Sequence, residues 1–240
     1  MGIHGEKLVA ALANEKLPPS DKERINVEEF LPVLVCKGLD LKAIDNDIDI
    51  TPQTPTFSSV HFNSSLSNSA VGGGLTIKTK DQDFALSRKL YIKSSYSEGF
   101  DADKTVTIAT NLGYILAEIK TNLDKTMFQE ASATARDIKL AVSGAKYFLL
   151  CDFLDMTPIS SATTDIDEIL VLRKAKRVSS NVRAKYSTFE GRKLSRNGYV
   201  KYLKDNPYVS DVFLRFVEHI LAQFNNETLV EEDVLNFGYF

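Results

Sequence analysis

The sequence predicts a mixed α/β fold, in which helices flank a central mixed sheet. Residues 105–108 alternate polar and apolar side chains, as a half-buried strand does, and residues 114–119 form a second, mainly apolar run. Residues 123–140 carry apolar side chains at helical spacing, and the continuous apolar run 147–151 is typical of a buried strand. The order strand, helix, buried strand predicts a right-handed βαβ unit.

The segments before this unit are expected to be helices, a loop and two strands. Residues 5–15 and 22–37 are expected to be N-terminal helices, the second interrupted near Pro32. Residues 45–73 are rich in Ser, Thr, Asn, Pro and Gly, which predicts a long surface loop. Short strands are expected at 75–79 and 84–94, separated by residues 80–83.

The C-terminal part is expected to contain one more strand, a basic segment and an amphipathic helix. The strand is predicted at 167–172 and the helix at 207–224, whose apolar residues recur at helical spacing. The chain is thus interpreted as a single domain of residues 1–240, with its core at about 75–155.

Two charged residues end the apolar run 114–119, and they are the first candidates for a functional site. Glu118 and Lys120 are two residues apart and therefore share one face of a strand. If residues 110–113 form a hairpin turn about Asn111-Leu112, Asp103 lies opposite Lys120 and reaches the same face. Two carboxylates and a lysine would then converge on a volume suited to a divalent cation and a phosphate.

The upstream carboxylate has two alternatives. Asp83 also opens a strand, but it precedes Glu118 by 35 residues, whereas Asp103 precedes it by 15 and fits a direct hairpin. Asp101 is the third candidate. Two similar acid-x-Lys triplets, Asp40-Leu41-Lys42 and Asp137-Ile138-Lys139, lack the strand–turn–strand context.

Composition excludes several classes of protein. The 240 residues are 43% hydrophobic and 25% charged, without an apolar run long enough to span a bilayer or to serve as a secretion signal. A cytoplasmic protein without membrane contact is expected. Cys36 and Cys151 both lie in apolar surroundings, which indicates buried free thiols.

The net charge of −3 conceals a strongly basic segment. Residues 173–204 contain eleven Lys or Arg and one acidic residue, Glu190. Such a stretch favours binding of nucleic-acid phosphates, although a solvated surface is the alternative. The expected DNA contacts are Arg173, Lys176, Arg177, Arg183, Arg192 and Lys193. If residues 45–73 are more than a surface loop, they are expected to be an arm that clasps DNA or a second subunit.

Asp103 with Glu118-Ile119-Lys120, followed by a helix and a buried strand, resembles the PD-(D/E)XK nuclease superfamily. The resemblance implies the αβββαβ core of most type II restriction endonucleases. Asp103, Glu118 and Lys120 match its two acids and its lysine, but Ala102 stands where its pattern has proline. The segments AEIKTNLDKTMFQEA and KYFLLCDFLDMTPIS look like a subfamily that cuts CTNAG-containing sites.

The resemblance also implies a chemistry. Asp103 and Glu118 would hold Mg²⁺, with the Ile119 carbonyl as a further ligand, and Lys120 would activate water and offset charge at the phosphate. Gln129 and Glu130 on the following helix, and Glu29 from an N-terminal helix, are additional candidates.

Three functions are therefore compatible with the sequence. The first is a restriction endonuclease that acts on double-stranded DNA as a homodimer, since two-fold sites favour two-fold proteins. The second is a repair or structure-specific nuclease with the same core, and the third is a non-catalytic DNA-binding protein.

Overall fold

The computed structural model describes residues 27–38, 47–224 and Leu235. Its strands are β1 (Ile48–Phe62), β2 (Leu75–Ser95), β3 (Thr105–Leu123), β4 (Lys146–Leu154) and β5 (Glu168–Lys176). Its α-helices are α2 (Val27–Gly38), α3 (Lys125–Ala141), α4 (Ser180–Ala184), α5 (Phe189–Asp205) and α6 (Ser210–Phe224). Short 3₁₀ turns, η2 (Val71–Gly74), η3 (Ala102–Lys104) and η4 (Ser161–Thr163), lie between them. The helix predicted at 5–15 lies outside the described residues.

The five strands form one mixed sheet in the order β1-β2-β3-β4-β5. The β1–β2 and β2–β3 pairs are antiparallel, whereas β3–β4 and β4–β5 are parallel. The predicted βαβ unit is confirmed, since α3 connects the parallel strands β3 and β4. The predicted strand near 167–172 and the C-terminal amphipathic helix are confirmed as β5 and α6.

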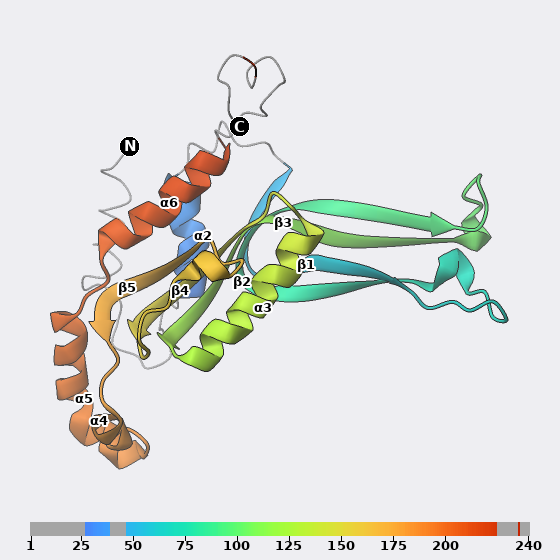
Figure 1. The fold of residues 1–240 in the computed structure, drawn as a ribbon. Coiled ribbons are helices and arrows are strands. Elements are labelled where there is room, and N and C mark those ends of the chain that lie inside the picture. The colour runs from blue at the N-terminus through green and yellow to red at the C-terminus, as the bar shows by residue number, and fades with distance from the viewer. Residues whose placement is uncertain (1–26, 39–46, 225–234, 236–240) are drawn as a thin grey trace.

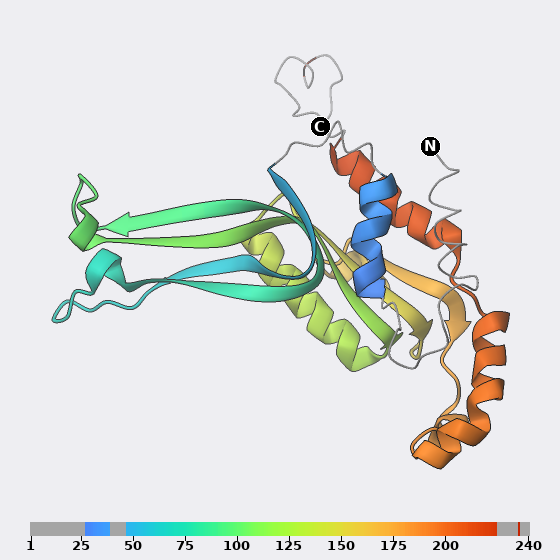
Figure 2. The same cartoon turned by 180° about the vertical axis from the view of Figure 1, so that it is seen from behind.

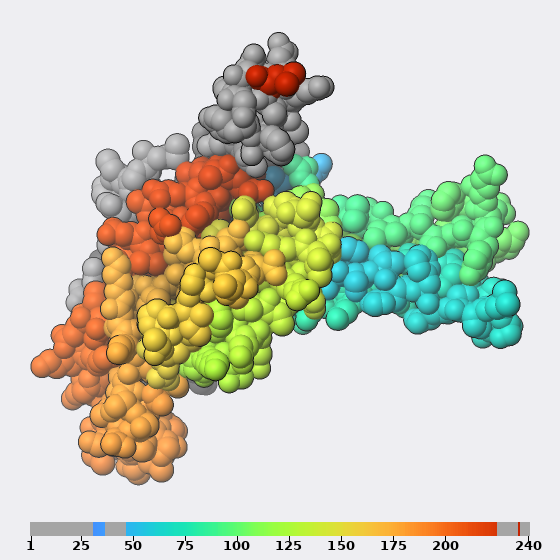
Figure 3. Space-filling view, in the orientation of Figure 1, coloured from blue at the N-terminus to red at the C-terminus, as the bar shows by residue number. Residues whose placement is uncertain are grey.

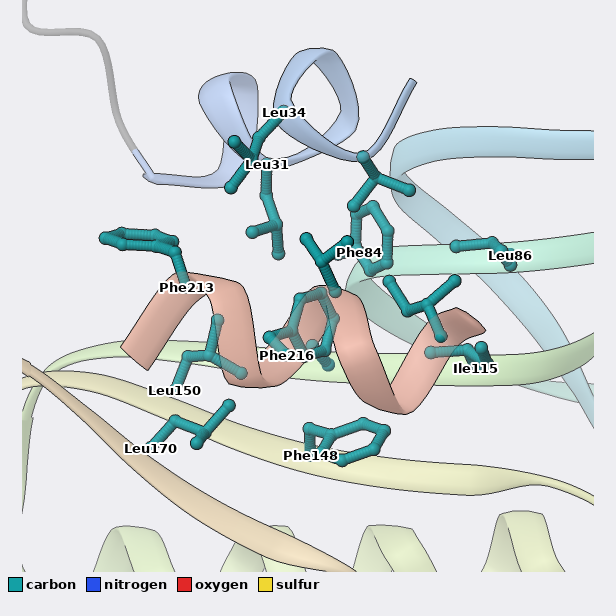
Figure 4. Packing of buried hydrophobic residues seen from close by; sticks show 14 of the residues in the cluster. Leu31, Leu34, Phe84, Leu86, Ile115, Phe148, Leu150, Leu170, Phe213 and Phe216 are labelled. Atoms are coloured by element: carbon teal, nitrogen blue, oxygen red, sulfur yellow. The ribbon is translucent and has the colours of Figure 1, made fainter. Parts of the chain in front are cut away.

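Helices cover both faces of the sheet (Figure 1), and an apolar core lies between the sheet and the helices on each face. On one face α2 and α6 pack against the sheet, with Phe216 of α6 edge-on to Phe84 and Phe148 (Figure 4). On the other face α3 buries Phe128, Ala131, Ala135 and Ile138. Burying each large apolar side chain stabilises the fold by about 2 kcal/mol. The helix α2 continues through Pro32, where an interruption was expected.

The strands β1, β2 and β3 extend beyond the body as a pair of long hairpins, here called the arm (Figures 1 and 2). Residues 63–74 connect one hairpin and residues 96–104 the other. The two hairpin ends lie together, since the hydroxyls of Ser64 and Tyr96 are 3.1 Å apart. Figure 3 shows how slender the arm is beside the body.

The arm contradicts the loop predicted at 45–73, because residues 48–62 form the long edge strand β1. Its inward side chains Thr54, Thr56 and Ser58 are buried but polar. The alternation of hydrophobic and polar residues that predicts a strand is therefore missing here. The Thr56 hydroxyl donates to the Lys80 carbonyl oxygen at 3.1 Å, which satisfies it inside the arm. Prolines are compatible with this strand because it lies at the edge of the sheet.

Two further expectations about the strands are wrong. Residues 75–95 form the single strand β2 rather than two strands. The turn predicted at 110–113 is absent from the described chain, because β3 runs unbroken from Thr105 to Leu123. Gly113 is needed there for packing: a Cβ atom would lie 2.8 Å from Leu116 and 3.1 Å from Thr56. The glycine therefore marks a close approach, not a turn.

The basic segment begins at the end of β5 and continues as α4 and α5, which project from the opposite end of the body (Figures 1 and 2). The helix α5 has no buried residue, and Phe189 and Leu194 are 68% and 84% exposed. No helix in the described part of the chain is long and apolar enough to cross a membrane.

Candidate active site

Glu118 and Lys120 lie together on β3, on the sheet face that α3 covers. The Lys120 Nζ atom is 2.7 Å from Glu118 Oε1, and the side chains are 31% and 18% exposed. The shared face follows from strand alternation, since the two residues are separated by one position. The predicted shared face is confirmed: a carboxylate and an ammonium meet on β3, near its C-terminal end at Leu123.

The second carboxylate at this place is Asp83 of β2. The antiparallel register pairs Phe84 with Ala117, so Asp83 stands next to the position of Glu118 on the neighbouring strand. The Asp83 Oδ2 atom accepts a hydrogen bond from the Ile119 backbone N–H at 2.7 Å. Asp83 is thus the acid that the tertiary structure brings to Glu118 and Lys120.

Asp103, the acid favoured by the sequence, lies in η3 at the far end of the β2–β3 hairpin. The pairing predicted between Asp103 and Lys120 is wrong, because Thr105 pairs with Ser95 and β3 has no turn at Asn111. A strand from there to Glu118 spans on the order of 40 Å. Asp101 lies at the same hairpin end, where it accepts a hydrogen bond from Ser97 at 2.7 Å.

Tyr147 is the residue of this site that sequence reasoning missed. It lies on β4, where it pairs with Leu116 in the parallel register, and it is fully buried. Its hydroxyl donates to Glu118 Oε2 at 2.8 Å. Nothing local in the sequence pointed to it, since its position within an apolar run gives only a buried strand.

The charges at the site act on one another. Burial alone would lower the pKa of Lys120, but the hydrogen bond and charge of Glu118, aided by Asp83 and Glu130, raise it. Burial raises the pKa of Tyr147, and the charges of Glu118 and Asp83 raise it further. Lys120 is therefore an ammonium and Tyr147 a neutral donor at physiological pH.

The donor set suits a hard divalent cation of the Mg²⁺ kind. Within the described residues no group of three or more His, Cys, Asp or Glu side chains converges. Mg²⁺ is commonly bound by one or two carboxylates together with water and substrate phosphates, and Asp83 and Glu118 supply two carboxylates. Of the additional candidates, Gln129 and Glu130 are exposed on α3, and the side chain of Glu29 lies outside the described structure.

A second cluster of a carboxylate, a tyrosine and a cation lies on the opposite sheet face. The Tyr208 hydroxyl donates to both oxygens of Asp152, at 3.1 and 3.2 Å. The Arg173 guanidinium stacks 3.7 Å over the Tyr208 ring and donates to the Asn206 carbonyl oxygen at 2.9 Å. Its Nε atom lies 3.7 Å from Asp152 Oδ2, and its side chain is 11% exposed. Arg173 is therefore held inside the protein.

The other expected DNA contacts divide into two groups. Arg177 and Arg183 approach Asp155, at 3.1 and 3.8 Å, and so hold the start of α4 to β4. Lys176, Arg192 and Lys193 have exposed side chains. Arg192 also donates to the Tyr186 carbonyl oxygen at 3.1 Å. The exposed cations are the ones available to a phosphate backbone.

The cysteines have no place in this site. Cys151 is buried in β4 and Cys36 is half-buried in α2, and both are free thiols as expected. Burial, with the nearby Asp152 charge, raises the pKa of Cys151 to about 12.

Comparison with known proteins agrees with this architecture. None of the curated proteins compared matches the chain. A solved structure described as the native BbvCI A2B2 tetramer is similar to it, with a TM-score of 0.58 and 20% sequence identity. The similarity covers 94% of this chain and 76% of that one, and it shows that the fold is shared. The sequence model of the Bpu10I restriction endonuclease matches residues 23–240. The chain therefore belongs to the Bpu10I restriction endonuclease family.

Proposed function

We propose that this restriction endonuclease hydrolyses phosphodiester bonds of double-stranded DNA in a Mg²⁺-dependent reaction centred on Asp83, Glu118 and Lys120. The observation that carries the proposal is the convergence of two carboxylates and one ammonium, from two strands, at a single place. Asp83 takes the role that the sequence had given to Asp103.

Each residue has a distinct task in this proposal. Asp83 and Glu118 would hold the cation, which supplies Lewis-acid polarisation of the phosphate and a more acidic water. The raised pKa of Lys120 favours its protonated form, which donates to the phosphate oxygens as negative charge develops. The hydrogen bond from the Ile119 N–H would hold the Asp83 carboxylate against β3, beside the position of Glu118.

DNA is proposed to run along the exposed cations of the basic segment. Lys176 at the end of β5 and Arg192 and Lys193 on α5 would neutralise backbone phosphates. Arg173, Arg177 and Arg183 would support this surface from within, because their contacts are to the protein.

Assembly into an oligomer is part of the proposal. A homodimer would supply one active site for each DNA strand, related by two-fold symmetry. The structure described as an A2B2 tetramer contains two kinds of chain, so pairing with a different subunit is the alternative. Light scattering of the purified chain, alone and with DNA, distinguishes these assemblies.

Digestion of plasmid and λ DNA tests the proposed reaction. Purified protein is incubated with Mg²⁺, with and without EDTA, beside its Glu118→Gln variant. Discrete fragments that require Mg²⁺ and Glu118 are expected. A smear would favour a nonspecific repair-type nuclease, and cleavage that survives in Glu118→Gln would overturn the assignment of the site.

A further inference from the structure

Both oxygens of the Glu118 carboxylate have a hydrogen-bond donor, and the two donors differ in mobility. Lys120 approaches Oε1 at 2.7 Å through a long aliphatic chain that is 31% exposed. Tyr147 donates to Oε2 at 2.8 Å from a ring that is fully buried. A lysine chain can swing to another acceptor at modest cost, whereas a packed tyrosine ring cannot. Oε1 is therefore the oxygen that can change partner.

The backbone of Tyr147 is held as firmly as its ring. Its N–H donates to Asp167 Oδ2 at 2.7 Å, and the same oxygen lies 2.6 Å from Lys139 Nζ. Lys146 contacts the other oxygen of Asp167 at 3.1 Å. Asp167 thus ties the start of β4 to α3, so the Tyr147 hydroxyl has a fixed position relative to Glu118.

We propose that Tyr147 is a positioning residue that reserves one Glu118 oxygen and thereby favours Mg²⁺ over Ca²⁺ at the active site. The inference rests on the proposed function, since it concerns the cation of that reaction. Ca²⁺ readily takes a carboxylate through both oxygens and tolerates irregular coordination, whereas Mg²⁺ requires a small, regular shell with one oxygen from each carboxylate. A hydrogen bond to Oε2 uses one of its lone pairs, so it disfavours coordination through both oxygens relative to coordination through Oε1 alone.

The substitution Tyr147→Phe tests this selectivity, because it removes the hydroxyl and keeps the ring. Titration calorimetry of the full chain with Mg²⁺ alone and with Ca²⁺ alone measures the two affinities without any cleavage. Loss of a partner that orients a metal ligand weakens binding by about 10- to 100-fold, so Mg²⁺ affinity should fall about tenfold. Ca²⁺ affinity should change by less than about threefold, since coordination through both oxygens is then no longer disfavoured.

Tyr208→Phe is the matched control. It removes a hydrogen bond from a half-buried tyrosine to a carboxylate, on the opposite sheet face. Both metal affinities should match those of the unsubstituted protein. In cleavage assays Tyr147→Phe should need about tenfold more Mg²⁺ for half-maximal rate, with the rate at saturating Mg²⁺ little changed.

The outcomes separate the inference from the function on which it rests. Equal loss of Mg²⁺ and Ca²⁺ affinity, or loss of neither, in Tyr147→Phe would overturn the selectivity role while Glu118→Gln still abolishes binding. If Glu118→Gln binds Mg²⁺ normally, the proposed site itself is wrong. Should Tyr147→Phe fail to fold, Glu118→Asp withdraws the carboxylate from the Tyr147 hydroxyl and should reduce the Mg²⁺ preference likewise.

Discussion

The two faces of the sheet carry the same three kinds of group in different settings. On the α3 face, Glu118 receives a hydrogen bond from Tyr147 and lies beside Lys120. On the α2–α6 face, Asp152 receives hydrogen bonds from Tyr208 and lies beside Arg173. In both clusters a tyrosine donates to a carboxylate, and a cation stands next to it, but Tyr147 is fully buried whereas Tyr208 is half-buried.

The cations make the difference between the two clusters. Arg173 is held by the Tyr208 ring, the Asn206 carbonyl and Asp152, so its planar group is enclosed. Lys120 is more exposed and is joined by a second carboxylate, Asp83, from another strand. An enclosed arginine stabilises the fold, whereas the more exposed ammonium beside Glu118 is the one proposed to act on a substrate. Solvent access and an additional acid, more than residue type, distinguish the cluster proposed to be active.

Lys120→Ala should have the largest effect on cleavage. Removal of a donor aimed at developing charge lowers the rate by roughly a thousandfold. The thermal midpoint should change little, because a half-exposed ammonium contributes little to folding. Initial rates of plasmid cleavage and a thermal melt measure the two quantities. Unchanged cleavage would contradict the catalytic role that is proposed for the Lys120 cluster but not for the Arg173 cluster.

Asp83→Asn should lower the cleavage rate by about a hundredfold. Removing a residue that only orients a metal ligand already lowers activity by about 10- to 100-fold, and Asp83 is proposed to bind the metal itself. Asp103→Asn, the corresponding change at the distant hairpin end, is the control and should cleave normally. The comparison uses single-turnover rates at fixed Mg²⁺. If Asp103→Asn were the defective variant, the site would have to be assembled differently, for instance with an acid from another chain.

Arg173→Ala should have the opposite effects to those expected of Lys120→Ala, with a large loss of stability and little change in cleavage. Removing one partner of a mostly buried pair leaves Asp152 uncompensated and lowers the free energy of unfolding by about 3 kcal/mol. Urea denaturation measures this loss. The folded fraction should retain its cleavage rate at low temperature. Full stability in this variant would contradict the structural role assigned to the α2–α6 cluster.

Lys193→Ala should have a smaller effect, confined to DNA binding. Loss of one phosphate contact should reduce the slope of log affinity against log salt by about 0.9. Fluorescence anisotropy with duplex DNA at several salt concentrations measures this slope. Arg136→Ala, an exposed cation on α3 outside the basic segment, is the control and should leave the slope unchanged.

The smallest effect is expected for the contribution of Asp167 to stability, which should depend on pH. Burial would raise the pKa of this carboxyl, but hydrogen bonds from Lys139, the Tyr147 N–H and Lys146 outweigh it and lower the pKa below 3.8. A lowered pKa contributes stability that is present above that value and is lost as the pH falls through the folded-state pKa. Asp167→Asn should therefore be less stable than the natural chain at pH 6, and the difference should shrink toward pH 3 in urea titrations.

The sequence by itself determined the βαβ unit and the pair Glu118 and Lys120. Hydrophobic patterning is a local signal. It identified α3 and α6 because each buries one stripe against the sheet, and β3 and β4 because their apolar runs are buried on both faces. Strand alternation alone places residues two apart on one face, so the acid and the lysine required no tertiary information.

Only the tertiary structure decided which residues join that pair. Asn111 and Gly113 have turn chemistry, yet they lie within β3, since Gly113 permits the close approach of Thr56. With that turn gone, strand register brings in Asp83, which is 35 residues from Glu118, and Tyr147 on the other side. Register depends on contacts between distant segments, and a hydrophobic pattern within one segment does not encode those contacts. The sequence thus determined the strand that carries the site, and packing between strands selected its remaining residues.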